Sequence, residues 1–155
     1  MKKQQKGFSL IELLIVVAII LIIAAIAIPN LLKSRIAANE ASAVGTVRTL
    51  NTAQVTYNSS CQQYANGIGE LNTGTVCPAG ANIIDATLAT GTKSGYTFVV
   101  IAPGTTANGT IGTTFDVNAD PITANVTGFR HFFSNESLVI RVNAAAKATN
   151  ASNPL

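Results

Sequence analysis

The sequence has few of the side chains from which metal sites and catalytic sites are built. It contains one histidine, His131, and two cysteines, Cys61 and Cys77. A structural zinc site needs four such ligands, so we expect no zinc. Serine and threonine are plentiful, but none is paired with a base, and no glycine-rich phosphate-binding loop is present. These absences predict a protein that is not an enzyme and that needs no cofactor or metal.

Charge is also scarce, and its distribution argues against a nucleic-acid-binding face. Charged residues make up 11% of the chain, and the formal net charge is +3. Lys2, Lys3 and Lys6 lie before Phe8, and the seven basic residues that follow are balanced by seven acidic ones. The sequence shows no basic stripe with interleaved aromatic residues, which is the usual sign of such a face.

One acidic stretch has part of the pattern of a calcium-binding loop. Asp116, Asn118 and Asp120 are spaced as D-x-N-x-D. The glycine and the later bidentate glutamate of such a loop are missing, and Pro121 follows Asp120 directly. We therefore expect no calcium site at these residues.

A long apolar run near the N-terminus is the strongest signal in the sequence. Residues 8–28 read FSLIELLIVVAIILIIAAIAI and hold one charge, Glu12. About 20 residues at about 1.5 Å rise each cross the hydrocarbon core of a bilayer. The lysines before the run predict that the N-terminus stays in the cytoplasm and that the rest of the chain lies outside. Removal of the whole run as a secretory signal is disfavoured, because Ala24, Ala25 and Ala27 offer only a weak cleavage site.

The residues around this run carry a family resemblance. KGFSLIELLIVVAIILIIAAIAIPN, which begins at Lys6, resembles the class III signal sequence and N-terminal helix of type IV pilins. A charged leader ends in Gly7, an aromatic residue follows at Phe8, Glu12 is the fifth residue after the glycine, and Pro29 closes the apolar run. The resemblance implies that a membrane-embedded prepilin peptidase cuts after Gly7, that residues 1–7 are a cleaved leader, and that Phe8 becomes N-methylated.

The physical chemistry of the cut gives Glu12 a role that does not depend on the resemblance. Cleavage would remove three cations and expose an amine at the head of an apolar helix. A carboxylate in an apolar setting needs a cation, and the Phe8 amine of the same or a neighbouring subunit could supply it. Such a pair sets register more than it adds stability, so we expect Glu12 to be an assembly residue. Alternatively, Glu12 lies in the headgroup region and reaches water.

The helix is expected to continue well beyond the apolar run. Pro29 lacks an N–H and should kink or locally open the helix, which makes it a second residue of interest for assembly. Apolar residues at Ile36, Ala43, Val44, Val47 and Leu50 then recur at helical spacing and predict one packing face. Charged residues are expected to lie elsewhere around this part of the helix: Lys33, Arg35, Glu40 and Arg48. We predict a single helix over residues 8–59, with residues 8–28 as its transmembrane and assembly segment.

Both cysteines fall on the predicted outer side of the membrane. Two cysteines in an oxidising compartment usually pair, and fifteen residues separate Cys61 from Cys77. A bridge would join the following loop to the helix end and stabilise the fold by about 3 kcal/mol. The alternative is two free thiols.

The remaining residues, 60–155, predict a small head built on an antiparallel sheet. A short helix is weakly indicated within residues 82–89, and the tail 144–155 is expected to be loose. Threonine, valine, phenylalanine and turn residues become frequent after Gly91. Strands are expected at residues 96–102, 113–118, 129–134 and 138–143.

The last two strands suggest a hairpin with a tight turn at Asn135 and Glu136. That register places Phe133 opposite Leu138, His131 opposite Ile140, and Phe129 opposite Val142, all on one apolar face. It makes His131 an ordinary sheet residue. It also sets Arg130 opposite Arg141, which is unfavourable and leaves the register open.

Together these features predict an α+β fold in which a long N-terminal helix packs on a small antiparallel sheet. The resemblance implies a pilin, a structural subunit that forms a homopolymeric type IV pilus. It also implies, as partners, the prepilin peptidase, a cytoplasmic assembly ATPase and an inner-membrane platform. The precursor would sit in the inner membrane and the product on the cell surface. Two alternatives remain: a pseudopilin of type II secretion or a minor pilin, and a single-pass membrane-anchored binding protein that never polymerises.

Processing is directly testable by intact mass. The mature chain should lack residues 1–7 and carry one added methyl group on Phe8. Gly7→Val should block the cut and leave the protein in the membrane. A mature chain that keeps its leader would instead favour the membrane-anchored binding protein.

Overall fold

The computed structural model describes residues 8–73, 82–102 and 112–155. Its contacts divide the chain into two units, Met1–Arg35 and Ile36–Leu155. One helix, α1 (Leu10–Cys61), contributes to both, and each unit is considered by itself.

The part of α1 in the first unit is apolar all round and has no core of its own. From Leu10 to Leu32 its large apolar side chains are exposed, most of them by half or more. This helix is long and apolar enough to cross a membrane. It continues through Pro29, which the structure places in its interior. Such a surface requires lipid or other helices around it.

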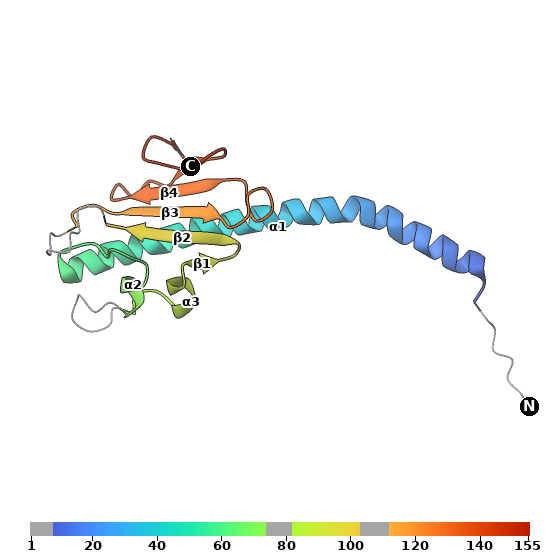
Figure 1. The fold of residues 1–155 in the computed structure, drawn as a ribbon, viewed down its shortest axis with the longest axis horizontal. Coiled ribbons are helices and arrows are strands. Elements are labelled where there is room, and N and C mark those ends of the chain that lie inside the picture. The colour runs from blue at the N-terminus through green and yellow to red at the C-terminus, as the bar shows by residue number, and fades with distance from the viewer. Residues whose placement is uncertain (1–7, 74–81, 103–111) are drawn as a thin grey trace, which may run out of the picture. The chain divides into compact units, whose positions relative to one another are not determined.

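In the second unit, α1 is apolar on one side and covers one face of the sheet (Figure 1). Ile36, Ala43, Val47 and Leu50 are buried, as their spacing predicts, and Val44 is partly buried at the edge of the core. Glu40 is also buried, with 6% of its surface exposed, so the expectation that it lies off this face is wrong. It stands four residues after Ile36 and three before Ala43, which is the same side of a helix.

Within the described residues, the sheet has six antiparallel strands in chain order, β1 to β6. A helical turn, α2 (Glu70–Thr73), and a second one, α3 (Ala86–Ala89), precede it. The Asp85 carboxylate caps α3 by accepting a hydrogen bond from the Leu88 N–H at 2.6 Å. The strands are β1 (Thr92–Lys93), β2 (Tyr96–Ile101), β3 (Asp116–Pro121), β4 (His131–Asn135), β5 (Arg141–Asn143) and β6 (Asn153–Pro154).

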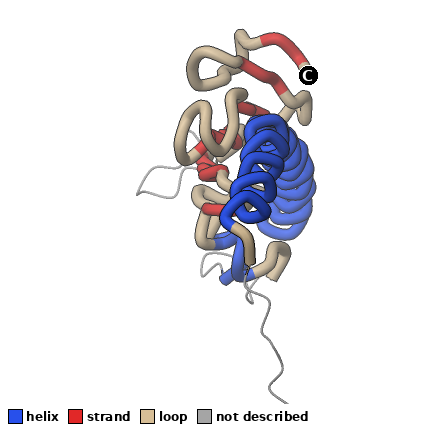
Figure 2. Tube along the Cα trace, turned by 90° about the vertical axis from the view of Figure 1, so that its right-hand side faces the viewer, coloured by secondary structure: helices blue, strands red, loops and turns tan. Residues whose placement is uncertain are grey.

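The inner face of the sheet forms a core with α1, and the two layers lie side by side in Figure 2. Phe98 is paired with Ala119, Ala119 with Phe132, and Phe132 with Val142, so these four side chains share one face. Phe98, Ala119 and Phe132 are almost fully buried.

Two helix amides contribute polar contacts inside this core. The Asn51 amide donates to Ser134 Oγ at 2.8 Å. Gln54 uses both ends of its amide on Ala65, donating to its carbonyl and accepting from its N–H, each at 2.9 Å. Gln54 therefore holds the segment after α1 as a neighbouring strand would.

The expected register of the last hairpin is wrong by three residues. Phe133 is opposite Arg141, not Leu138, and Phe132 is opposite Val142. The turn is longer than two residues, because the Asn135 side chain accepts hydrogen bonds from the N–H and hydroxyl of Ser137, and Leu138 adopts a φ of 61°. A register shift by an odd number of residues exchanges the faces of one strand relative to its partner. Phe132 and not Phe133 therefore shares a face with Val142, and Phe132 belongs to the core.

The tail is also more ordered than expected. β6 pairs with β5, and the Leu155 N–H donates to the Ile140 carbonyl at 2.9 Å. The Asn143 side chain accepts from the N–H groups of Ala145 and Ala146, which starts the turn back toward the sheet. Local side-chain bonds of this kind fix a polar segment that composition alone suggests is loose.

Two glycines give a matched test of the packing. A Cβ on Gly128 would overlap the ring and hydroxyl of Tyr96, whereas a Cβ on Gly45 would meet nothing within 4 Å. Gly128→Ala should lower the free energy of unfolding by about 1–3 kcal/mol. Gly45→Ala should raise it by roughly 0.5–1 kcal/mol, because alanine favours a helix interior. Thermal unfolding of the full chain in detergent micelles measures both, and equal shifts for the two variants would contradict this packing.

Candidate processing and assembly site

The start of α1 is built around Glu12. α1 begins at Leu10, so Ser9 is the residue before its first turn. The Ser9 N–H donates to Glu12 Oε2 at 2.9 Å, and the Leu13 N–H donates to the Ser9 carbonyl at 3.2 Å. This is half of a capping box, in which a glutamate in the first turn satisfies an N–H that the helix itself leaves free. The carboxylate also lies at the positive end of the helix dipole.

The geometry brings Glu12 close to the residue that processing would make the N-terminus. Phe8 directly precedes Ser9, and 80% of its surface is exposed. Among the described residues, the Ser9 N–H is the one hydrogen-bond donor to the Glu12 carboxylate, and it uses one of the two oxygens. Gly7, on the other side of the expected cut, lies outside the described residues. The cleavage and methylation therefore stay predictions.

The expected disulfide between Cys61 and Cys77 also stays a prediction. Cys61 is the last residue of α1, at the point where the helix gives way to the segment held by Gln54. Its expected partner, Cys77, lies outside the described residues. The pairing stays a prediction.

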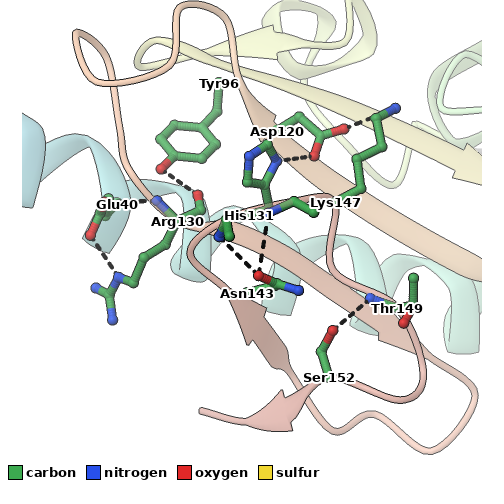
Figure 3. Close-up of polar contacts among 11 residues, drawn as sticks. Glu40, Tyr96, Asp120, Arg130, His131, Asn143, Lys147, Thr149 and Ser152 are labelled. Atoms are coloured by element: carbon green, nitrogen blue, oxygen red, sulfur yellow. Dashed lines mark hydrogen bonds and ion pairs between the residues drawn. The ribbon is translucent and has the colours of Figure 1, made fainter.

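Where the second unit begins, Glu40 binds the loop between β3 and β4 to α1. It accepts hydrogen bonds from the N–H groups of Phe129 at 2.9 Å and Arg130 at 3.2 Å, and from Arg130 Nε at 2.7 Å (Figure 3). On the same turn of α1, the Asn39 amide donates to the Thr127 carbonyl at 2.9 Å. From the other side, the Tyr96 hydroxyl donates to the Arg130 carbonyl at 2.8 Å. Sequence reasoning missed this contact, although a glutamate in register with Ile36 and Ala43 was the available signal.

The environment of Glu40 favours its charged form. Burial alone would raise its pKa, but hydrogen bonds from the Phe129 N–H and the Arg130 side chain outweigh burial and bring the pKa below the ordinary value of 4.5. The Arg130 side chain is 44% exposed, so its charge is partly screened by water. We attribute most of the contribution to the two backbone N–H groups.

His131 lies on the outer face of the sheet and not in an apolar cluster as expected. Its Nδ1 is 2.6 Å from Asp120 Oδ1, and Lys147 Nζ is 3.3 Å from the other carboxylate oxygen (Figure 3). Lys147 lies in the tail, so this group ties the tail to β3 and β4. Asp120 is thus occupied by nitrogen partners, and no metal-binding cluster of three or more acidic, histidine or cysteine residues occurs in the described part of the chain.

A long apolar helix followed by a small antiparallel sheet is the α+β architecture of type IV pilins. Residues 2–28 match the family model of the prokaryotic N-terminal methylation motif. No solved structure matches the chain significantly.

Three relatives that match parts of the chain are all named as major components of type IV pili or fimbriae. The chain is 43% identical over 68 residues to the type IV major pilin protein PilA of Myxococcus xanthus, covering 44% of this chain and 31% of that protein. It is 63% identical over 38 residues to the type IV wide pilus major component PilA4 of Thermus thermophilus, covering 24% and 29%. It is 42% identical over 95 residues to the type IV major fimbrial protein FimA of Dichelobacter nodosus, covering 61% and 56%.

The matched regions thus span between about three-tenths and a little over half of the length of these relatives. With the methylation motif and the fold, they support the chain as a member of the type IV pilin family.

The lowered pKa of Glu40 makes a pH-dependent prediction. A carboxylate whose pKa is lower in the folded state stabilises the fold above its ordinary pKa, and this contribution is lost as the pH falls through the folded value. Glu40→Gln should therefore lower the free energy of unfolding at pH 7 by about 1–3 kcal/mol, with a deficit that shrinks in acid. Unfolding at neutral pH and at several values below 4.5 measures this.

Glu136→Gln is the control for this prediction. Glu136 is an exposed carboxylate on the turn after β4. Its removal should change the stability at neutral pH much less than Glu40→Gln. A Glu40→Gln deficit that stays constant from neutral pH into acid would show that the charge of Glu40 is not what stabilises the loop.

Proposed function

We propose that this chain is the structural subunit of a type IV pilus, held in the inner membrane before assembly and polymerised through the apolar part of α1. The observation that carries the proposal is a helix whose large apolar side chains are all exposed from Leu10 to Leu32 and whose first turn holds one carboxylate. Burying one such side chain is worth about 1.5–3 kcal/mol, so the helix is stable only in lipid or among other helices.

In this proposal the helix changes its surroundings without unfolding. A prepilin peptidase removes residues 1–7 and Phe8 is methylated. The helix then moves from lipid, which matches its apolar surface, into a bundle of identical helices. Dispersion contacts with lipid are exchanged for contacts with other subunits, so the net driving force is modest and the few polar groups decide the register.

Glu12 is the group that decides this register. It is prepositioned by the Ser9 N–H, and its second oxygen, which has no hydrogen-bond donor among the described residues, would accept from the Phe8 amine of a neighbouring subunit. A carboxylate entering an apolar bundle is costly unless a cation meets it, so subunits at the wrong height are penalised. We propose Pro29 as the second assembly residue, because a proline removes one helix hydrogen bond and gives a point at which the helix can bend.

The proposal also includes the assembly partners of the subunit and its orientation in the membrane. The subunit binds copies of itself, and assembly uses a cytoplasmic ATPase and an inner-membrane platform. The N-terminus faces the cytoplasm in the precursor, and the sheet domain lies outside. Three relatives are named as major pilus or fimbrial proteins. Their names favour a main filament subunit over a pseudopilin, a minor pilin or an anchored binding protein.

Filament formation by a Glu12 variant tests this function. Cells expressing the unaltered chain should yield sheared surface filaments whose subunit, by mass spectrometry, is this protein. Glu12→Ala should leave membrane insertion intact, because an apolar residue replaces a charge and the leader lysines remain. Filaments should become rare, since the neighbour's amine would be left uncompensated at a cost of roughly 3–5 kcal/mol.

Two results would count against the proposal. Filaments of normal number and length from Glu12→Ala cells would show that the pairing is unimportant. An unaltered chain that is processed but never recovered in filaments would exclude the subunit role itself. A variant of a neighbouring apolar residue, Leu13→Ala, is the matched control, because it shortens a side chain in the same turn and leaves the carboxylate in place.

A further inference from the structure

The loop between β3 and β4, residues 122–130, carries three exposed large apolar side chains that the filament proposal does not use. Ile122, Val126 and Phe129 are exposed to 57%, 53% and 47%, respectively. The stretch ITANVTGF, from Ile122 to Phe129, contains no charged residue. We call Ile122, Val126 and Phe129 the apolar loop surface.

This surface is held in place by a dense set of hydrogen bonds. Within the loop, the N–H groups of Val126 and Thr127 donate to the Thr123 carbonyl at 3.2 and 2.9 Å, and the Asn125 N–H donates to the Gly128 carbonyl at 3.0 Å. Asn39 and Glu40 bind the loop from α1, as described above. Three large apolar side chains are therefore fixed toward water at a cost that a mobile loop would avoid.

The position of the loop along the chain limits what it can meet. The second unit begins at Ile36, and its next helical turn, at Asn39 and Glu40, holds the loop. Leu32, which follows the apolar run 8–28, is the last large apolar residue before Lys33. Eight residues from Leu32 to Glu40 rise about 12 Å along α1, and a bend between the two units could only shorten this distance. In a membrane-inserted precursor the loop therefore lies within reach of the lipid surface.

We propose that the apolar loop surface inserts into the lipid headgroup region and seats the sheet domain on the membrane before assembly. The inference rests on the proposed membrane-anchored precursor. Lys33 and Arg35 lie between the apolar run and the second unit, where lipid phosphates would accept their charge. Small uncharged loops with aliphatic and aromatic tips suit this boundary.

A second protein molecule fits the surface less well. A stable protein interface buries about 800 Å² per partner, which three half-exposed side chains cannot supply. Lipid needs no matching shape, and a membrane-spanning helix would keep the loop near the lipid, so a small apolar contribution suffices.

The absence of tryptophan from the chain allows a clean test. Val126→Trp introduces a single reporter on the apolar loop surface. Val99→Trp is the matched control, because Val99 is also a half-exposed valine, 41% exposed, on the outer face of β2. The full chain is reconstituted into phosphatidylcholine vesicles with and without lipids brominated on the acyl carbons nearest the headgroup. Both leaflets carry bromine, so the direction of insertion does not affect the result.

Fluorescence of the Val126→Trp variant should shift to shorter wavelength and be quenched by the brominated lipids roughly threefold more strongly than that of the Val99→Trp variant. Equal and weak quenching in both variants would overturn the inference. A blue shift without quenching would also overturn it, because another copy of the chain would then be covering the loop. Ile122→Trp is a second reporter on the same surface, and circular dichroism checks that each variant is folded.

Flotation of the vesicles in a density gradient tests the membrane-anchored precursor separately from the insertion of the loop. A chain that fails to float with the vesicles would remove the membrane-anchored precursor, and with it the proposed function. A Val126→Trp chain that floats while its tryptophan stays exposed to water would remove only the seating of the loop.

Discussion

The contact between Glu40 and the loop after β3 determines how the second unit is held together. A carboxylate on a buried helix face is costly unless its lone pairs are used, and here three donors from Phe129 and Arg130 use them. Because two of the donors are backbone groups, the loop conformation and the ionisation of Glu40 depend on each other. Gly128 and Tyr96 complete the arrangement, since a residue with a side chain at 128 would displace the tyrosine whose hydroxyl bonds to Arg130. One helix position thus holds the two residues that directly precede β4.

The two parts of α1 have surfaces suited to different surroundings. In the first unit, its large apolar side chains are exposed within the described chain, so its stability depends on lipid or on other helices around it. In the second unit the same helix supplies the core of a sheet domain through Ala43, Val47 and Leu50. The proposed assembly would therefore need no refolding of the second unit. The change is confined to the surroundings of the first unit and to the few polar groups at its start.

The features readable from sequence are those set by composition and period. The apolar run, the helix face at Ile36, Ala43, Val47 and Leu50, and the antiparallel sheet all follow from patterns that many residues repeat. The errors come from single side chains that act locally. Asn135 lengthens a turn and moves the register by three residues, and with it the expected surroundings of His131. Asn143 folds back a tail that composition predicts to be loose. The polarity of Glu40 suggests an exposed residue, although its position in the helical period places it on the buried face.

The outermost strands of the sheet have a consequence for a crowded surface. β1 is two residues long and includes Lys93, while β6 includes Pro154, which has no N–H to offer a further strand. Short edges, lysine and proline all oppose the pairing of one sheet with another. If sheet domains with open edges were packed closely along a fibre, they could pair into a continuous β-sheet that would not dissociate. With both edges blunted, neighbouring domains can touch and separate again, and the strength of any polymer is left to its helices.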